Sequence, residues 1–76
     1  MHRVPVESSS IDSVGYEKKV LEVCFRNGGL YQYLDVPEQM LALLMQAESK
    51  GRFFNQHIRG AYPCVRLKRA AGVGVV

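Results

Sequence analysis

The chain has no long apolar run, and it contains only two cysteines and two histidines among its 76 residues. A membrane-spanning helix needs about 20 apolar residues in succession, so the sequence predicts no transmembrane segment. No apolar stretch follows the N-terminal Met-His-Arg-Val-Pro, so we expect no signal peptide and a cytoplasmic location. In that compartment Cys24 and Cys64 are expected to be reduced thiols. A chain this short has room for one small hydrophobic core.

The scarcity of histidine and cysteine also argues against a metal site and against catalysis. His2, Cys24, His57 and Cys64 form none of the closely spaced pairs that a zinc site needs. A nucleophilic serine needs a base within hydrogen-bonding distance, and His57 is expected on a helix beside cations. We therefore expect no metal, no cofactor and no catalytic residue. A hydrolase that uses His57 is kept only as a rival hypothesis.

Carboxylates are missing from the whole second part of the chain. The last acidic residue is Glu48, and the first 48 residues carry seven acids against four bases. The remaining residues carry no acid and six cations: Lys50, Arg52, Arg59, Arg66, Lys68 and Arg69. A charge division of this size indicates an acidic partner, of which nucleic acid is the commonest kind.

The apolar pattern of the first part predicts three antiparallel strands, at residues 11–16, 20–26 and 30–35. Leu21, Val23 and Phe25 alternate with polar side chains and are expected to share one face of the sheet. The Asn-Gly-Gly sequence at residues 27–29 predicts a hairpin turn, because Asn and Gly tolerate positive φ. Residues 4–6 are expected to form an extended entry to the sheet.

Two helices are predicted after the strands. Pro37 suits a helix start, and residues 38–48 carry an apolar stripe at helical spacing. Ser49 is expected to cap a second helix, in which Phe54, Ile58 and Tyr62 share a face. The predicted fold class is therefore α+β, a three-stranded antiparallel meander followed by two helices on one sheet face. We expect one domain over residues 1–66 and a flexible, basic, glycine-rich tail over residues 67–76.

Several short motifs, in this order and spacing, resemble those of the KTSC domain family, small domains named for the C-terminal extension of some lysyl-tRNA synthetases. The matching segments are Ser8-Ser9 with Ile11, Val14-Gly15-Tyr16-Glu17, Leu21-Glu22-Val23 with Phe25, Gly29-Leu30-Tyr31-Gln32-Tyr33, Val36-Pro37, Ala47-Glu48-Ser49-Lys50-Gly51, Phe54-Asn55, Ile58-Arg59 and Tyr62. The resemblance implies a small α+β domain with a suggested RNA-binding role. It implies no catalytic residue.

The basic second part is the candidate nucleic-acid site. Cations that neutralise phosphates release counterions, which makes binding favourable and dependent on salt. We expect the six cations to contact phosphates, and Asn55 and His57 to add polar contacts beside them; RNA or another polyanion is the expected partner. The alternative is that these charges form only a solvated helix face and a charged tail.

Tyr31 and Tyr33 are candidates for stacking on nucleobases, since residues two apart on a strand share a face. A two-residue turn would pair Tyr31 with Cys24 and place both rings on the open face. A three-residue turn at residues 27–29 would pair Tyr31 with Phe25 and place them in the core under the helices, the register that the extra glycine favours.

A protein-interaction module or a homodimer is the alternative function. If both helices cover one face of the sheet, then Val20 and Cys24 contribute to a partly apolar patch on the other face. The segment at residues 4–6 is a candidate to cover that patch.

Overall fold

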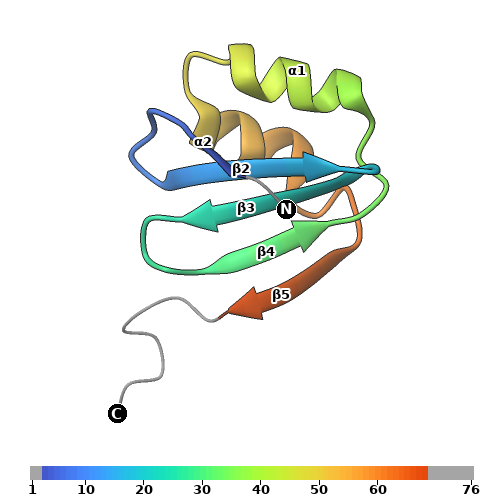
Figure 1. Ribbon diagram of the computed structural model, residues 1–76. Coiled ribbons are helices and arrows are strands. Elements are labelled where there is room, and N and C mark those ends of the chain that lie inside the picture. Colours follow the sequence, from blue (N-terminus) through green and yellow to red (C-terminus); the bar gives the residue numbers. More distant parts are fainter. Residues whose placement is uncertain (1–2, 69–76) are drawn as a thin grey trace.

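The computed structural model describes residues 3–68 as a five-stranded antiparallel sheet with two helical segments on one of its faces (Figure 1). The strands lie side by side in chain order, from β1 to β5. Their bounds are β1 (Arg3–Pro5), β2 (Ile11–Glu17), β3 (Val20–Phe25), β4 (Leu30–Tyr33) and β5 (Cys64–Lys68). Between β4 and β5 lie the helix α1 (Glu38–Gln46), the helix α2 (Lys50–Phe53) and the π-helix η1 (Phe54–Ile58), which directly continues α2.

The predicted α+β class is confirmed, but the predicted number of three strands is wrong. The first additional strand is β1, which pairs only with β2, with Val4 opposite Val14. Pro5 has no N–H to donate, so a strand that contains it is tolerated at a sheet edge. Residues 4 and 5 therefore extend the sheet sideways, and they do not cover its open face.

The second additional strand is β5, which pairs with β4 at the opposite edge of the sheet. Every residue of β5 is exposed, so this strand lacks the buried apolar face that signals a strand in sequence. Charged and apolar side chains nevertheless alternate along it from Val65 to Lys68. Leu67 and Lys68, expected in the tail, belong to this strand, and residues 69–76 lie outside the described part of the chain.

The β3–β4 hairpin has neither of the two predicted registers. The backbone N–H of Phe25 donates to the carbonyl of Gly29 at 2.8 Å, which closes a three-residue loop at residues 26–28. Gly28 has a φ of +95°, the conformation that glycine supplies in such loops. Tyr31 pairs with Val23 and Tyr33 with Leu21.

The observed register differs by two residues from the predicted three-residue alternative. Because side chains alternate with a period of two, this shift changes the partners and preserves the face. Tyr31 and Tyr33 therefore lie on the face of Leu21 and Val23, as that alternative predicted.

The core lies between this face and the helices. Leu21 and Val23 from β3 pack with Leu44 of α1 and with Phe54 and Ile58 of η1, and all five are buried. The predicted N-cap is confirmed, since the Ser49 hydroxyl accepts a hydrogen bond from the Arg52 N–H at 3.3 Å. No helix within residues 3–68 is long and apolar enough to cross a membrane.

The opposite face of the sheet carries one polar row. Arg3, Gly15, Glu22, Gln32 and Val65 lie directly opposite one another from β1 to β5. Gly15 has no side chain, and the Arg3 guanidinium reaches across it to the Glu22 carboxylate at 2.7 Å. The Gln32 amide donates to the same carboxylate at 2.9 Å from the other side. Glu22 is therefore only 6% exposed although no described helix covers this face.

Candidate nucleic-acid interface

A groove of about 340 Å³ opens beside the second helical segment, on the helix-bearing side of the sheet. Strands β3 and β4 form its floor, α2 and η1 form one wall, and the loop before β2 contributes Ser10. Aromatic and polar side chains line it together: Ser10, Phe25, Asn27, Tyr31, Tyr33, Gly51, Phe54, Asn55 and Arg59. A concave site with an aromatic base and a few polar groups is typical of ligand binding.

Four aromatic rings in edge-to-face contact form the base of the groove. The ring centroids are 5.6 Å apart for Phe25 and Tyr31, 5.3 Å for Phe25 and Phe54, and 5.2 Å for Tyr33 and Phe54. Tyr33 is 5% exposed and belongs to the core, whereas Tyr31 is half-buried at its margin. The two tyrosines therefore do not form an open platform, and Tyr31 offers the more accessible ring.

The helical wall brings Asn55 and Arg59 to the groove. Gly51, Asn55 and Arg59 are spaced four residues apart and line the same cavity. The turn that carries them is a π-helix, in which the Arg59 N–H donates to the Phe54 carbonyl five residues back at 2.9 Å. Single-turn π-helical segments that continue an α-helix occur frequently at functional sites.

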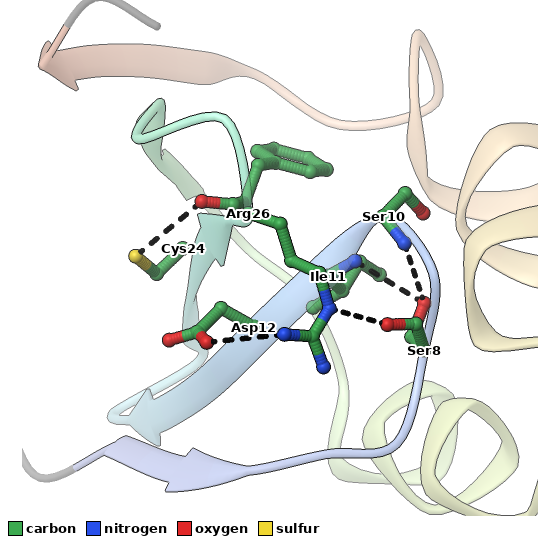
Figure 2. Close-up of polar contacts among 7 residues, drawn as sticks. Ser8, Ser10, Ile11, Asp12, Cys24 and Arg26 are labelled. Carbon is green, nitrogen blue, oxygen red and sulfur yellow. Dashed lines mark hydrogen bonds and ion pairs between the residues drawn. The ribbon is translucent and has the colours of Figure 1, made fainter. Parts of the chain in front are cut away.

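The loop at residues 8–10 forms the end wall, and Arg26 of the hairpin holds it in place (Figure 2). The Arg26 Nε donates to the Ser8 carbonyl, and its backbone N–H donates to the Ser10 carbonyl at 2.9 Å. The Ser8 hydroxyl in turn accepts from the backbone N–H groups of Ser10 and Ile11. On the other side, a Cβ added to Gly51 would lie 2.5 Å from the Ser10 Oγ. The loop is thus confined between the hairpin and α2.

The structure places the predicted site residues at different distances from this groove. Asn55 and Arg59 line it, and Arg66 of β5 lies opposite Tyr31 on the same sheet face. Lys68 pairs with Leu30, whose side chain has the opposite orientation, so Lys68 lies toward the open face. Arg69 lies outside the described residues.

The remaining predicted residues lie outside the groove lining. Arg52 is exposed on α2, and the Lys50 ammonium donates to the Ala47 carbonyl at 3.2 Å. His57 stacks on Phe53, with ring centroids 4.6 Å apart, and is not among the lining residues. The predicted cations are therefore distributed around the second helical segment and the β5 edge, with Arg59 and Arg66 nearest to the aromatic base.

The cations of the second part are not neutralised by carboxylates. Within residues 3–68 the two ion pairs are Arg3 with Glu22 at 2.7 Å and Arg26 with Asp12 at 3.7 Å. All four residues belong to the first part of the chain. In the described residues after Glu48, therefore, no cation is paired with a carboxylate: Lys50, Arg52, Arg59, Arg66 and Lys68.

Tyr33 has a perturbed environment at the base of the groove. Burial raises the pKa of Tyr33 above its ordinary value, and the adjacent Cys64 thiol raises it further. The positive charge of Arg59 acts in the opposite direction and lowers this pKa. The neutral form of the Tyr33 phenol is therefore favoured over the charged form more strongly than in a free tyrosine.

The potential metal-ligand side chains within residues 3–68 are dispersed. Over residues 3–68 no three histidine, cysteine, aspartate or glutamate side chains are grouped to hold a metal ion. Cys24 is half-buried, Cys64 is exposed, and both are free thiols. The expectation of a site without metal or cofactor stays a prediction.

The fold is that of a small α+β domain, built on an antiparallel meander with one helix-covered face. The KTSC domain model matches residues 7–62, and the chain belongs to this family, which confirms the resemblance drawn from the sequence motifs. The crystal structure of a KTSC domain protein from Yersinia pestis is 46% identical, with a TM-score of 0.85, and the match covers 88% of this chain and 97% of that one.

Two further relatives show the contexts in which such a segment occurs. An uncharacterized protein of Stutzerimonas stutzeri is 48% identical over 58 residues, which are 74% of this chain and 82% of the relative. A lysine–tRNA ligase of Nostoc punctiforme is 38% identical over 63 residues, which are 80% of this chain and 11% of the ligase. Segments similar to this chain therefore occur both in small proteins and as part of a larger enzyme.

Sequence reasoning missed five groove residues: Ser10, Phe25, Asn27, Gly51 and Phe54. Asn27 carried a local signal, since its side chain caps the hairpin by accepting from the Gly29 N–H at 3.0 Å. Ser10 and Gly51 carried none, because the loop and the helix meet only in the folded chain.

Proposed function

We propose that this KTSC domain is a non-enzymatic module that binds RNA or a similar polyanion through the surface formed by α2, η1 and β5. The observation that carries the proposal is the set of cations without carboxylate partners on these elements: Lys50, Arg52, Arg59, Arg66 and Lys68. Such cations favour phosphate groups because binding releases condensed counterions.

Two further points support an RNA partner. A similar segment occurs in a lysine–tRNA ligase, an enzyme named for a tRNA substrate. The groove beside the cations also supplies aromatic and amide groups, which bind nucleobases in many RNA-binding proteins. Binding without catalysis fits the position of His57, which stacks on Phe53 and does not line the groove.

The salt dependence of RNA binding tests the proposal. Fluorescence anisotropy with a mixed pool of single-stranded RNA gives the affinity at two salt concentrations. If all five cations contact phosphates, we expect the affinity to fall about 100-fold between about 50 and 200 mM salt. Replacing Arg52→Glu together with Arg59→Glu removes two contacts and reduces the slope of log affinity against log salt by about 1.4.

A matched control separates local contacts from net charge. Lys18→Glu with Lys19→Glu changes the charge by the same amount at the β2–β3 turn, where both residues have positive φ and no groove residue lies. This variant should keep most of the affinity. If both double variants lose the same amount of RNA affinity, or if the affinity does not change with salt concentration, α2 and η1 do not form the site.

An interaction module for a protein partner or a second copy of the chain is a second candidate function. It is favoured by the open sheet face, where Val65 is 43% exposed next to Gln32 and no described element covers the strands. Sedimentation equilibrium tests it through self-association that is insensitive to salt and is lost in Val65→Ser. That result, together with no measurable RNA binding, would favour this function over the first.

A further inference from the structure

We propose that the groove between β4 and η1 receives one unpaired nucleobase, so that the partner of this domain is single-stranded rather than duplex RNA. The inference rests on the proposed function and specifies its partner. It is carried by an aromatic base, a ring of hydrogen-bonding groups and an exposed guanidinium in one cavity.

The aromatic base provides the stacking surface. Tyr31 is half-buried and its ring contacts Phe25 edge to face at 5.6 Å, so packing holds it in position while part of it stays accessible. Phe25 also contacts Phe54, and Phe54 contacts Tyr33. A ring held in this way loses little rotational freedom when a base stacks on it, and stacking is tolerant of base identity.

Polar groups from three separate elements line the groove together with the aromatic rings. Asn27 comes from the hairpin, Asn55 from η1 and Ser10 from the loop before β2. An amide side chain offers two donors and an acceptor, and a serine hydroxyl offers both functions, so the edge of any nucleobase finds partners here. The Asn27 oxygen already accepts from Gly29, which orients its amide group.

The charges next to the groove complement a nucleotide phosphate. Arg59 lines the cavity and is exposed, and Arg66 lies opposite Tyr31 on the adjacent strand. Neither has a carboxylate within ion-pair distance among residues 3–68. A base stacked on Tyr31 therefore has cations close to its phosphate on both the helix side and the β5 side.

Duplex RNA cannot use this site. In an A-form helix the bases are stacked and paired, and a protein reaches mainly phosphates and 2′-hydroxyl groups. Only a nucleobase that leaves the base stack can enter a cavity of about 340 Å³ and contact the aromatic rings at its floor. The groove thus favours a single strand, whereas the surrounding cations alone would favour the more highly charged duplex.

Three polyanion probes test the inference: a 12-nucleotide RNA of mixed sequence, its blunt duplex and inorganic polyphosphate. The duplex carries about twice the charge of the single strand, so charge alone would favour the duplex. We expect the single strand to bind at least about tenfold more tightly than the other two. Tyr31→Leu, which keeps an apolar side chain at the core margin, should weaken single-strand binding by about 5- to 150-fold, the range for one stacked base. It should leave polyphosphate binding unchanged.

A pair of neighbouring helix variants keeps the test independent of core packing. Asn55 and Gln56 are both exposed on η1, but only Asn55 lines the groove. Asn55→Ala should weaken single-strand binding by about 2- to 10-fold, the range for one lost hydrogen bond, whereas Gln56→Ala should have no effect.

The failure of this inference is distinguishable from failure of the proposed function. If all three probes bind alike and the Tyr31 and Asn55 variants bind like the wild type, the groove inference is overturned while polyanion binding stands. If none of the probes binds, both are overturned.

Discussion

The polar row on the open sheet face makes a sharp prediction about stability. The Glu22 side chain is 8% exposed, and it depends on Arg3 at 2.7 Å and Gln32 at 2.9 Å for its hydrogen bonds. Removing Arg3 leaves a buried carboxylate with one neutral donor, which is costly because the charge has lost its counterion and is kept from water. We expect Arg3→Ala to destabilise the fold because it leaves the Glu22 charge buried without a counterion.

The geometry sets the size of the effect. A hydrogen bond to a charged group contributes about 1.5–3 kcal/mol, and breaking a fully buried pair costs about 3–5 kcal/mol. The Arg3 side chain is 37% exposed, so solvent already screens part of the attraction, and about 2 kcal/mol is the expected loss. For a domain of this size that loss lowers Tm by about 8–16 °C.

The assay is urea unfolding of four chains: the wild type, Arg3→Ala, Glu22→Gln and the double variant. Glu22→Gln removes the unpaired carboxylate charge and keeps an oxygen that accepts from Gln32. The double variant should therefore be no less stable than Arg3→Ala alone. Asp12→Asn is the control; it removes the exposed ion pair with Arg26 and should cost at most about 0.5 kcal/mol. Costs of the two single variants that add within about 0.5 kcal/mol would refute the coupling.

Three further predictions concern the groove and its walls. Burial raises the pKa of Tyr33 above about 10, so in alkaline solution the folded chain keeps a proton that the unfolded chain releases. The free energy of unfolding should therefore fall as the pH rises above about 10. Urea unfolding at several alkaline pH values should show a shallower fall for Tyr33→Phe. Gly51→Ala gains up to about 1 kcal/mol of helix propensity but crowds the Ser10 hydroxyl, so thermal melts should show the full gain only in a Ser10→Ala background. Ser49→Ala should cost about 1 kcal/mol through loss of the N-cap, and Ser49→Asp should restore it; equal melting temperatures for both variants would contradict the capping role.

The fold was predictable where local signals were strong. The alternation of Leu21, Val23 and Phe25 predicts the buried face of β3, and Ser49 predicts the start of the second helix, as the structure confirms. Both features depend only on side-chain periodicity and on hydrogen bonds between residues close in sequence. Family membership was likewise predictable, since it rests on ordered short motifs.

The edges of the sheet were not predictable in the same way. β1 is three residues long and contains Pro5, so it is too short to show a strand pattern. The alternation in β5 spans only the four residues 65–68, and none of them is buried. The predicted register of the β3–β4 hairpin was wrong because the three-residue loop begins at Arg26, one residue before the Asn-Gly-Gly sequence that predicted the turn. The Arg26 backbone and guanidinium bind the loop at residues 8–10, a contact across the sheet that no local pattern reveals.

The amino-acid sequence by itself determined the α+β class, the buried face of the central strands and the concentration of cations after Glu48, because each follows from composition or from the spacing of nearby residues. Only the tertiary structure decided that β5 carries Arg66 to Tyr31 and that the π-helix brings Asn55 and Arg59 to the same cavity. These residues are brought together by strand pairing and helix packing across the core. Their proximity therefore depends on long-range contacts and is absent from any short stretch of the chain.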